Sequence, residues 1–111
     1  MPVGIGRQGT DGSGAPAEST GAPLTRTVEI VNRRGLHARA AAKFVKTADS
    51  FTSDIQVTRC GQTVSGRSIM GLMMLAASPG CTIDIAISGP DAARAMDTLV
   101  ALVAARFEED E

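Results

Sequence analysis

The segment Gly35-Leu36-His37-Ala38-Arg39 holds the only histidine of the chain, and an alanine-rich stretch, residues 38–45, begins directly after it. A glycine turn followed by strong helix formers predicts a helix that begins at the histidine. The first N–H groups of a helix have no intrahelical partner, and with the helix dipole they form an anion site. An imidazole there could carry a phosphoryl group, and the arginine could neutralise part of its charge. The alternative is an ordinary residue near a helix end.

Around this segment, short runs alternate between apolar and polar residues, which is typical of strands. Such runs cover residues 24–30, 54–58 and 63–65, and the clearest covers 82–88, where three isoleucines alternate with polar or small residues. Helical periodicity indicates helices after residue 37, after Ser68 and from about residue 89 to 107. The buried stripe of this last helix is predicted to contain Met96, Leu99, Val100, Val103 and Phe107. The order β-α-β-β-α-β-α favours an α+β fold, a small antiparallel sheet with helices on one face.

The charge and composition of the 111 residues divide the chain into three parts. Residues 1–23 hold six of the twelve glycines and three of the five prolines, and we expect a disordered N-terminal extension. Residues 24–107 form one small domain with ten Lys or Arg against six Asp or Glu. Residues 108–111 are all acidic and are assigned to an acidic tail. The mildly basic domain suggests an anionic ligand or an acidic partner.

Several classes of function are disfavoured. Aromatic residues make up 3% of the chain, with no Trp or Tyr, so we expect no nucleic-acid binding. One histidine and two cysteines, Cys60 and Cys81, provide no metal-ligand set, so we expect neither a metal nor a cofactor. No apolar run approaches the length of a membrane span and no signal core is recognisable. We therefore expect a cytoplasmic protein without membrane insertion, with both thiols reduced.

The predicted helix after Ser68 has more apolar residues than one buried face requires. Ser68 is a good N-cap residue. The inward-facing stripe is predicted to contain Ile69, Leu72, Met73 and Ala76. Met70 and Met74 are left on the side that should face water. Exposed apolar clusters often mark binding sites, which favours a partner surface here, and the alternative is a core that wraps further around this helix.

Two segments of the chain resemble signatures of one known family. Residues 32–41 (NRRGLHARAA) resemble the phosphohistidine signature of HPr, the small phosphocarrier of the bacterial phosphoenolpyruvate-dependent phosphotransferase system. Residues 66–72 (GRSIMGL) resemble the regulatory-serine signature of the same family. The separation of the two segments and the order of elements also fit. The resemblance covers about residues 24–107 and implies an open-faced β-sandwich with a four-stranded antiparallel sheet and three helices.

By this resemblance, His37 accepts phosphate on ring nitrogen Nδ1 and Arg39 contacts the phosphoryl group. The backbone N–H groups of Ala38 and Arg39 are the expected phosphate-binding donors. Ser68 matches the serine that HPr kinase/phosphorylase modifies in lineages that have that enzyme. One departure is Ala40, where the family usually has proline. Since alanine is the best helix former, the helix should still begin here.

These expectations define a phosphocarrier that takes phosphate from phosphoenolpyruvate through enzyme I and passes it from His37 to an enzyme IIA domain. It is expected to be a monomeric carrier that needs its partners, rather than a self-sufficient enzyme. The predicted partner surface consists of Met70, Met74 and Arg67. A basic rim of Arg33, Arg34, Lys43 and Arg67 could steer acidic partners. The alternatives are a regulatory module of the nitrogen-type branch controlled by Ser68, and an unrelated α+β interaction domain with an incidental histidine.

Overall fold

Strands and helices follow one another in the order that sequence periodicity predicts. The computed structural model of the protein describes residues 22–109. The elements are β1 (Leu24–Glu29), α1 (Ala38–Ala48), β2 (Asp54–Arg59), β3 (Gln62–Ser65), α2 (Ile69–Met74), β4 (Thr82–Ser88), α3 (Ala92–Ala104) and a short 3₁₀ turn, η2 (Arg106–Glu108). The predicted disordered extension lies outside the described residues except for residues 22 and 23, as do residues 110 and 111 of the predicted acidic tail.

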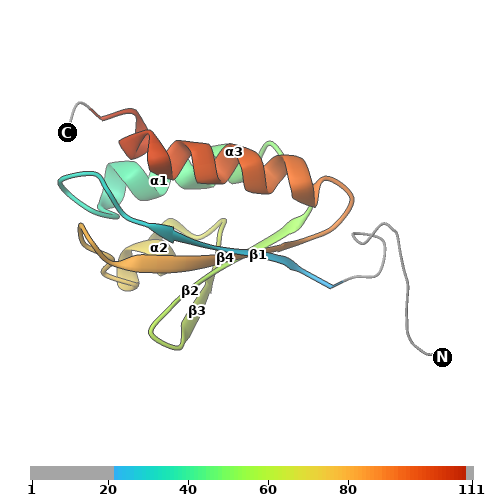
Figure 1. Ribbon diagram of the computed structural model, residues 1–111, viewed down its shortest axis with the longest axis horizontal. Coiled ribbons are helices and arrows are strands. Elements are labelled where there is room, and N and C mark those ends of the chain that lie inside the picture. The colour runs from blue at the N-terminus through green and yellow to red at the C-terminus, as the bar shows by residue number, and fades with distance from the viewer. Residues whose placement is uncertain (1–21, 110–111) are drawn as a thin grey trace.

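The four strands form one antiparallel sheet in the order β1-β4-β2-β3 (Figure 1). Strand β4 lies inside the sheet, where its central Ile85 pairs with Arg26 of β1 and with Val57 of β2. Ile83, Ile85 and Ile87 are buried, and the residues between them face the other way. The alternation of isoleucines in the sequence is therefore the inner face of the sheet.

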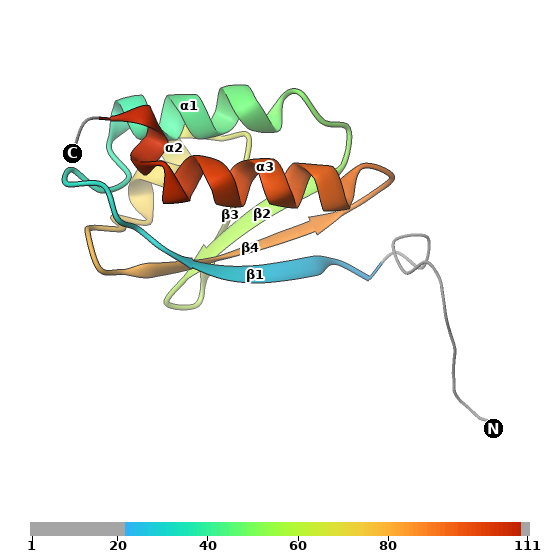
Figure 2. The ribbon, with the colours of Figure 1, turned by 45° about the horizontal axis from the view of Figure 1, so that its top comes forward.

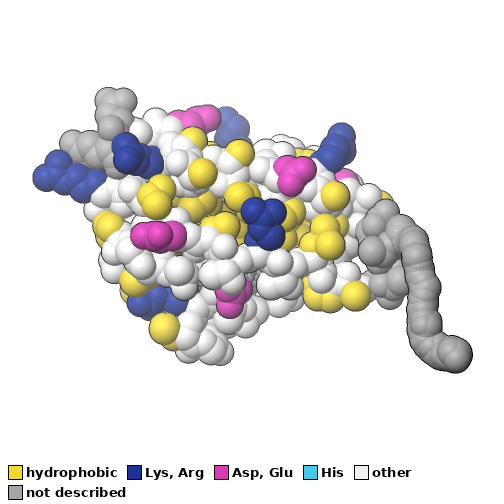
Figure 3. All heavy atoms as spheres, viewed as in Figure 1, with side chains coloured by type: hydrophobic (Ala, Val, Ile, Leu, Met, Phe, Trp, Pro, Cys, Tyr) yellow, Lys and Arg dark blue, Asp and Glu magenta, His cyan; other side chains and the backbone are white. Residues whose placement is uncertain are grey.

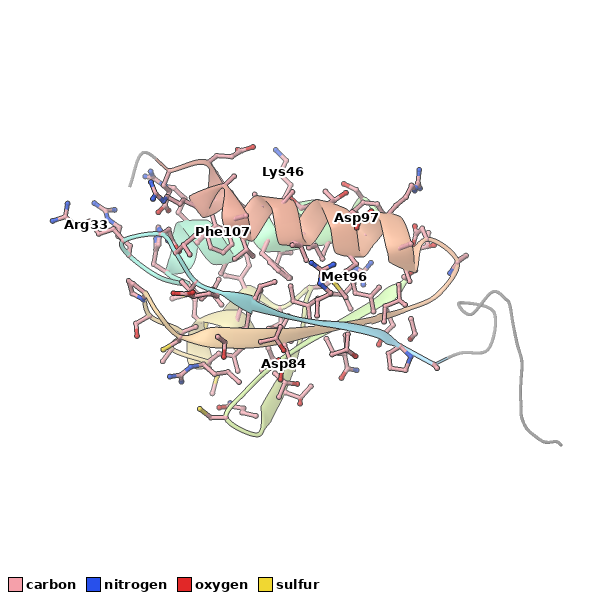
Figure 4. All side chains as sticks on the ribbon, in the orientation of Figure 1. Arg33, Lys46, Asp84, Met96, Asp97 and Phe107 are labelled. Atoms are coloured by element: carbon pink, nitrogen blue, oxygen red, sulfur yellow. The ribbon has the colours of Figure 1, made fainter. Side chains whose placement is uncertain are left out.

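Helices α1 and α3 lie side by side over this inner face, and α2 packs against α1 and β3 (Figures 1 and 2). Met96 points from α3 toward the sheet, whereas Asp84 lies on the opposite, open face (Figure 4). The core between the layers also contains Phe44 of α1, which is fully buried. The predicted α+β fold, with a four-stranded antiparallel sheet and three helices, is thus confirmed.

Helix α2 differs from its predicted orientation in the core. It is only six residues long and buries Leu72 alone. The prediction that Ile69, Met73 and Ala76 face inward is wrong, because Ile69 and Met73 are each 40% exposed and Ala76 is also exposed. The helix ends at Met74 and Ala76 has left-handed backbone (φ +53°), so the helical periodicity does not continue to this residue.

Helix α3 ends at Ala104, three residues before the predicted end of its buried stripe. Phe107 is nevertheless fully buried, as predicted, and lies beneath the end of α3 (Figure 4). It enters the core from η2, where Arg106, Phe107 and Glu108 all have positive φ angles of 54° to 64°. Left-handed backbone reverses the direction of a chain, so the residues after Phe107 turn back over the end of the molecule that carries the β1–α1 loop (Figure 2).

The β1–α1 loop is fixed by the close approach of Gly35 to the loop before β4. Gly35 has φ +67°, and a Cβ atom there would lie 2.5 Å from the carbonyl oxygen of Ala77 and 2.9 Å from Cα of Ser78. The next amide, Leu36 N–H, donates to the same Ala77 oxygen at 2.9 Å. Only glycine therefore fits at the residue that sets the entry into α1.

We predict that Gly35→Ala destabilises the fold far more than Gly61→Ala does. Gly61 also has a positive φ (+79°), but no atom lies within 4 Å of the position that a Cβ atom would take there. Its substitution should cost only the left-handed strain of about 1–2 kcal/mol. Gly35→Ala adds overlap with backbone atoms and should cost on the order of 3 kcal/mol or more. The free energy of unfolding from urea titration measures both, and equal losses would contradict the role given to this close approach.

Candidate phosphoryl-acceptor site

His37 lies at the N-cap of α1, as the sequence predicts. Its backbone is extended (φ −80°, ψ −179°), and its carbonyl oxygen accepts the first helical hydrogen bond, from Ala41 N–H at 2.8 Å. The amides of residues 38–40 precede that bond and have no acceptor within the helix. The His37 side chain makes no capping bond to them and remains 24% exposed. The His37 imidazole is therefore carried at the positive end of the helix, whose first N–H groups have no helical acceptor.

Arg39 is in the first turn of α1 and is exposed, as is Ala38. Among residues 22–109, the Arg39 guanidinium has neither a hydrogen bond nor an ion pair with another side chain. Its charge is thus available to an anion that binds at the helix N-terminus. Ala40, at the position where proline was expected, is fully buried and belongs to the helix, so the helix begins without the proline.

Glu109 contacts His37, and sequence analysis missed this contact. One carboxylate oxygen, Oε2, pairs with His37 Nε2, and the other, Oε1, accepts a hydrogen bond from Asn32 Nδ2 at 3.1 Å. The sequence analysis assigned Glu109 to an acidic tail, because four consecutive acids have no periodicity that would show a contact across 72 residues of sequence. The only signal was the apolar Phe107 so close to these acids.

The electrostatics of the site keep Glu109 ionised. Burial alone would raise the pKa of this carboxyl, but the hydrogen bonds from His37 and Asn32 and the positive charge of Arg34 act against it. Together these effects place the pKa of Glu109 below its ordinary value. The carboxylate is therefore charged at neutral pH and can only accept hydrogen bonds.

The Asn32 side chain links the glycine turn at Gly35 to the Glu109 carboxylate by hydrogen bonds. Its side chain is fully buried, and Nδ2 donates both to Gly35 O at 2.7 Å and to Glu109 Oε1. Its Oδ1 has no hydrogen-bond partner among the described residues. The amide thus holds the glycine turn in place and orients Glu109 toward His37.

Basic residues gather at the same end of the molecule. Figure 3 shows Lys and Arg side chains at the end where Figure 4 places Arg33, in the loop before His37. Lys43, which the sequence analysis placed in a basic rim, is instead engaged within the domain. Its Nζ donates to the carbonyl oxygen of Phe107 at 2.9 Å and lies 3.4 Å from Glu108 Oε1. Lys43 therefore ties the chain after α3 to α1.

Ser68 caps α2 as predicted, because its Oγ accepts a hydrogen bond from Gly71 N–H at 2.9 Å. Met70 and Met74 are 70% and 65% exposed, which confirms that they lie on the side facing water. With the half-exposed Ile69 and Met73 they form an apolar surface that we call the α2 patch. The patch is thus larger than the sequence predicts.

In the described part of the chain, no group of His, Cys, Asp and Glu side chains could hold a metal ion. No helix within residues 22–109 is both long and apolar enough to span a membrane.

Comparison with known proteins identifies the family. Residues 24–105 match the family described as PTS HPr component phosphorylation site. The chain belongs to the HPr family. It is an HPr-type phosphocarrier of the phosphotransferase system, as the sequence resemblance indicated.

Relatives of the HPr family support this assignment along the whole domain. The phosphocarrier protein HPr of Cupriavidus necator is 49% identical over 88 residues, which cover 79% of this chain and 99% of the relative. The crystal structure of HPr-C-His from Thermoanaerobacter tengcongensis is 41% identical with a TM-score of 0.76, and covers 79% of this chain and 99% of that one. The phosphocarrier protein NPr of Shewanella violacea is 42% identical over 86 residues, which cover 78% of this chain and 94% of the relative.

Arg67, predicted to belong to the partner surface, is occupied with backbone contacts in this HPr domain. Its Nη2 donates to the carbonyl oxygens of Ala48 at 3.0 Å and Phe51 at 2.6 Å, and Nε lies 3.4 Å from Asp49 Oδ1. These are the last carbonyl of α1 and one from the loop that follows it. Arg67 thus satisfies acceptors at the C-terminal end of α1. A further role in docking stays a prediction.

We predict that Arg67→Met lowers the free energy of unfolding by about 1–3 kcal/mol, because two carbonyls lose a charged donor. Lys46→Met is the matched control, since Lys46 points away from the body of the protein (Figure 4) and should change stability by less than about 0.5 kcal/mol. Chemical denaturation measures both. If Arg67→Met leaves stability unchanged and only weakens partner binding, the contacts to α1 are not what this arginine contributes.

Proposed function

We propose that His37 accepts a phosphoryl group on Nδ1 from enzyme I, which is charged by phosphoenolpyruvate, and passes it to an enzyme IIA domain. The single observation that carries this proposal is the position of His37 at the start of α1, partly exposed and at a helix end whose first amides have no helical partner. The exposed Arg39 in the same helical turn adds a positive charge for the phosphoryl oxygens. Membership of the HPr family supports the same assignment.

The transfer needs little chemistry from the chain itself. The lone pair of Nδ1 forms a bond to phosphorus, and the bond from phosphorus to the donor atom of enzyme I breaks, with its electron pair staying on that atom. Phosphoryl transfer depends mainly on positioning and on stabilising the charge of the phosphoryl oxygens. The amides of residues 38–40 and the Arg39 guanidinium supply that stabilisation. The second transfer, to enzyme IIA, repeats the step with His37 as the donor.

A carrier must dock two different partners in turn, and the α2 patch is suited to that task. Four large apolar side chains, Ile69, Met70, Met73 and Met74, are exposed together on one short helix. Such a patch is unusual on a small domain that binds nothing. Methionine is flexible and polarisable, so the same surface can pack against partners of different shape. We therefore assign docking of enzyme I and enzyme IIA to the α2 patch.

Ser68 lies at the edge of this docking surface and is the proposed regulatory site. A phosphate on its oxygen would carry a charge of about −1.5 to −2 next to Ile69 and Met70. The same oxygen already faces the amide of Gly71, so added negative charge is compatible with α2. The effect of modification would then fall on docking rather than on the fold.

We predict that His37→Ala abolishes phosphate acceptance from enzyme I and phosphoenolpyruvate, because the chain has no second histidine. Arg39→Ala should slow transfer through the loss of one charge-assisted contact, worth about 1.5–3 kcal/mol. Lys46→Ala, at the other end of α1, removes the same charge and is the control. Acid-labile phosphate in rapid-quench samples reports all three. Acid-labile label on the His37→Ala protein would refute the assignment, and equal rates for the two cation variants would exclude Arg39.

We predict that Ser68→Asp keeps the fold but raises the concentration of carrier needed to half-saturate enzyme I. Ser68→Asn is the matched control, because Asn caps a helix about as well as Asp and adds no charge. Transfer rate measured against carrier concentration separates the two possible effects. A lower maximal rate with unchanged half-saturation would place the effect at His37, and the docking explanation would then be wrong.

A further inference from the structure

The chain after α3 is built to return to the site. Phe107 is fully buried, and Lys43 Nζ holds its carbonyl oxygen at 2.9 Å. Three successive left-handed residues, 106–108, turn the backbone toward the β1–α1 loop. Left-handed backbone is unfavourable for residues other than glycine, so the turn needs these anchors to persist. Its position is thus a product of core packing and a side-chain hydrogen bond.

At the site, each carboxylate oxygen of Glu109 has a hydrogen-bond partner. Oε2 pairs with His37 Nε2 and Oε1 accepts from the buried Asn32 amide. The Glu109 side chain is only 15% exposed, whereas that of Glu108, one residue earlier, is 72% exposed. Two adjacent acids of the same charge thus have different environments, and only the second is directed at the histidine.

The contact determines which ring nitrogen carries the proton. An ionised carboxylate has no hydrogen to donate, so His37 Nε2 must be the donor and must carry the proton. In a neutral imidazole the other nitrogen, Nδ1, is then unprotonated. An unprotonated nitrogen has the lone pair that a bond to phosphorus requires.

We propose that Glu109 is a positioning residue for His37: it holds the Nε2–H tautomer, so that Nδ1 is the nucleophile, and its charge balances the ring once Nδ1 is phosphorylated. This inference rests on the proposed function, in which His37 is the phosphoryl acceptor. The carboxylate acts through the imidazole and does not touch the phosphoryl group.

The charge argument follows from the atoms of the step. When neutral imidazole with a proton on Nε2 bonds phosphorus through Nδ1, no proton leaves, and the ring becomes a substituted imidazolium with one positive charge. Glu109 already faces Nε2, where that charge can form a charge-assisted hydrogen bond. The same logic applies to a carboxylate that orients a catalytic histidine and stabilises its cation.

The negative charge of Glu109 does not compete with the phosphoryl group for its binding site. The two ring nitrogens lie on different sides of the imidazole, and Glu109 takes the Nε2 side. The helix amides and Arg39 then remain for the anion at Nδ1. The histidine thus lies between a fixed carboxylate and the anion site of the helix N-terminus.

The test uses the full chain and three variants, Glu109→Ala, Glu109→Gln and Glu108→Ala. Nitrogen-15 NMR of the imidazole reports the tautomer without any partner protein. Rapid-quench transfer from enzyme I and phosphoenolpyruvate reports the rate. Glu108→Ala is the matched control, because it removes an acid from the same turn and leaves His37 untouched.

We expect the wild type and Glu108→Ala to show the Nε2–H tautomer and equal transfer rates. Glu109→Ala should admit the Nδ1–H tautomer and slow transfer by about tenfold or more, as expected when a hydrogen bond to a charged group is lost. Glu109→Gln keeps an acceptor oxygen without the charge, so it should largely retain the tautomer and still slow transfer.

The inference is overturned if Glu109→Ala leaves the tautomer or the transfer rate at the wild-type value. It is also overturned if Glu108→Ala slows transfer as much as Glu109→Ala, because the turn as a whole would then be responsible. A wild-type chain that accepts no phosphate at all would instead refute the proposed function, while the tautomer measurement would still test the Glu109–His37 contact.

Discussion

The site depends on the close approach of Gly35 to the backbone of Ala77 and Ser78. This contact packs the loop before α1 against the loop before β4, and the Leu36 amide bonds to the same Ala77 oxygen. His37 follows Leu36 directly, so the position of its imidazole depends on a backbone contact that tolerates no side chain. The sheet and the two long helices supply the rigid body against which this contact is made (Figure 2).

Sequence patterns were sufficient for the fold because each element has its own local signal. The alternating isoleucines of β4 and the alanine-rich start of α1 reflect burial on one face, which periodicity reports directly. Helix α2 is where periodicity failed, since a six-residue helix has too few turns to define a face, and Ile69 and Met73 proved half-exposed. The prediction of where α3 ends was wrong for another reason. The apolar character of Phe107 correctly indicated burial, but it gave no sign that the backbone at this residue is left-handed.

Part of the candidate site could also be predicted, because some of its residues lie in segments with a local sequence signal. His37, Arg39 and Ser68 lie in segments where a turn residue or a cap marks a helix start, so their positions in the helices could be predicted. Glu109 reaches the site only through tertiary contacts, with Asn32 and His37, and both span most of the domain. A run of four acids has the composition of a solvated tail, so only the three-dimensional structure could separate the anchored Glu109 from the exposed Glu108. Arg67 likewise resembled a surface cation until its contacts with α1 carbonyls were seen.

The reversal of the chain after α3 also has a consequence for handling the protein. Glu109 lies against the His37 imidazole. A purification tag or fluorophore fused directly after Glu109 would therefore begin beside the His37 imidazole. Strand β1 starts at the opposite end of the domain (Figure 1), so a probe attached at Leu24 is separated from the histidine by the length of the sheet. Labels for binding or transfer work are therefore best placed at the start of β1.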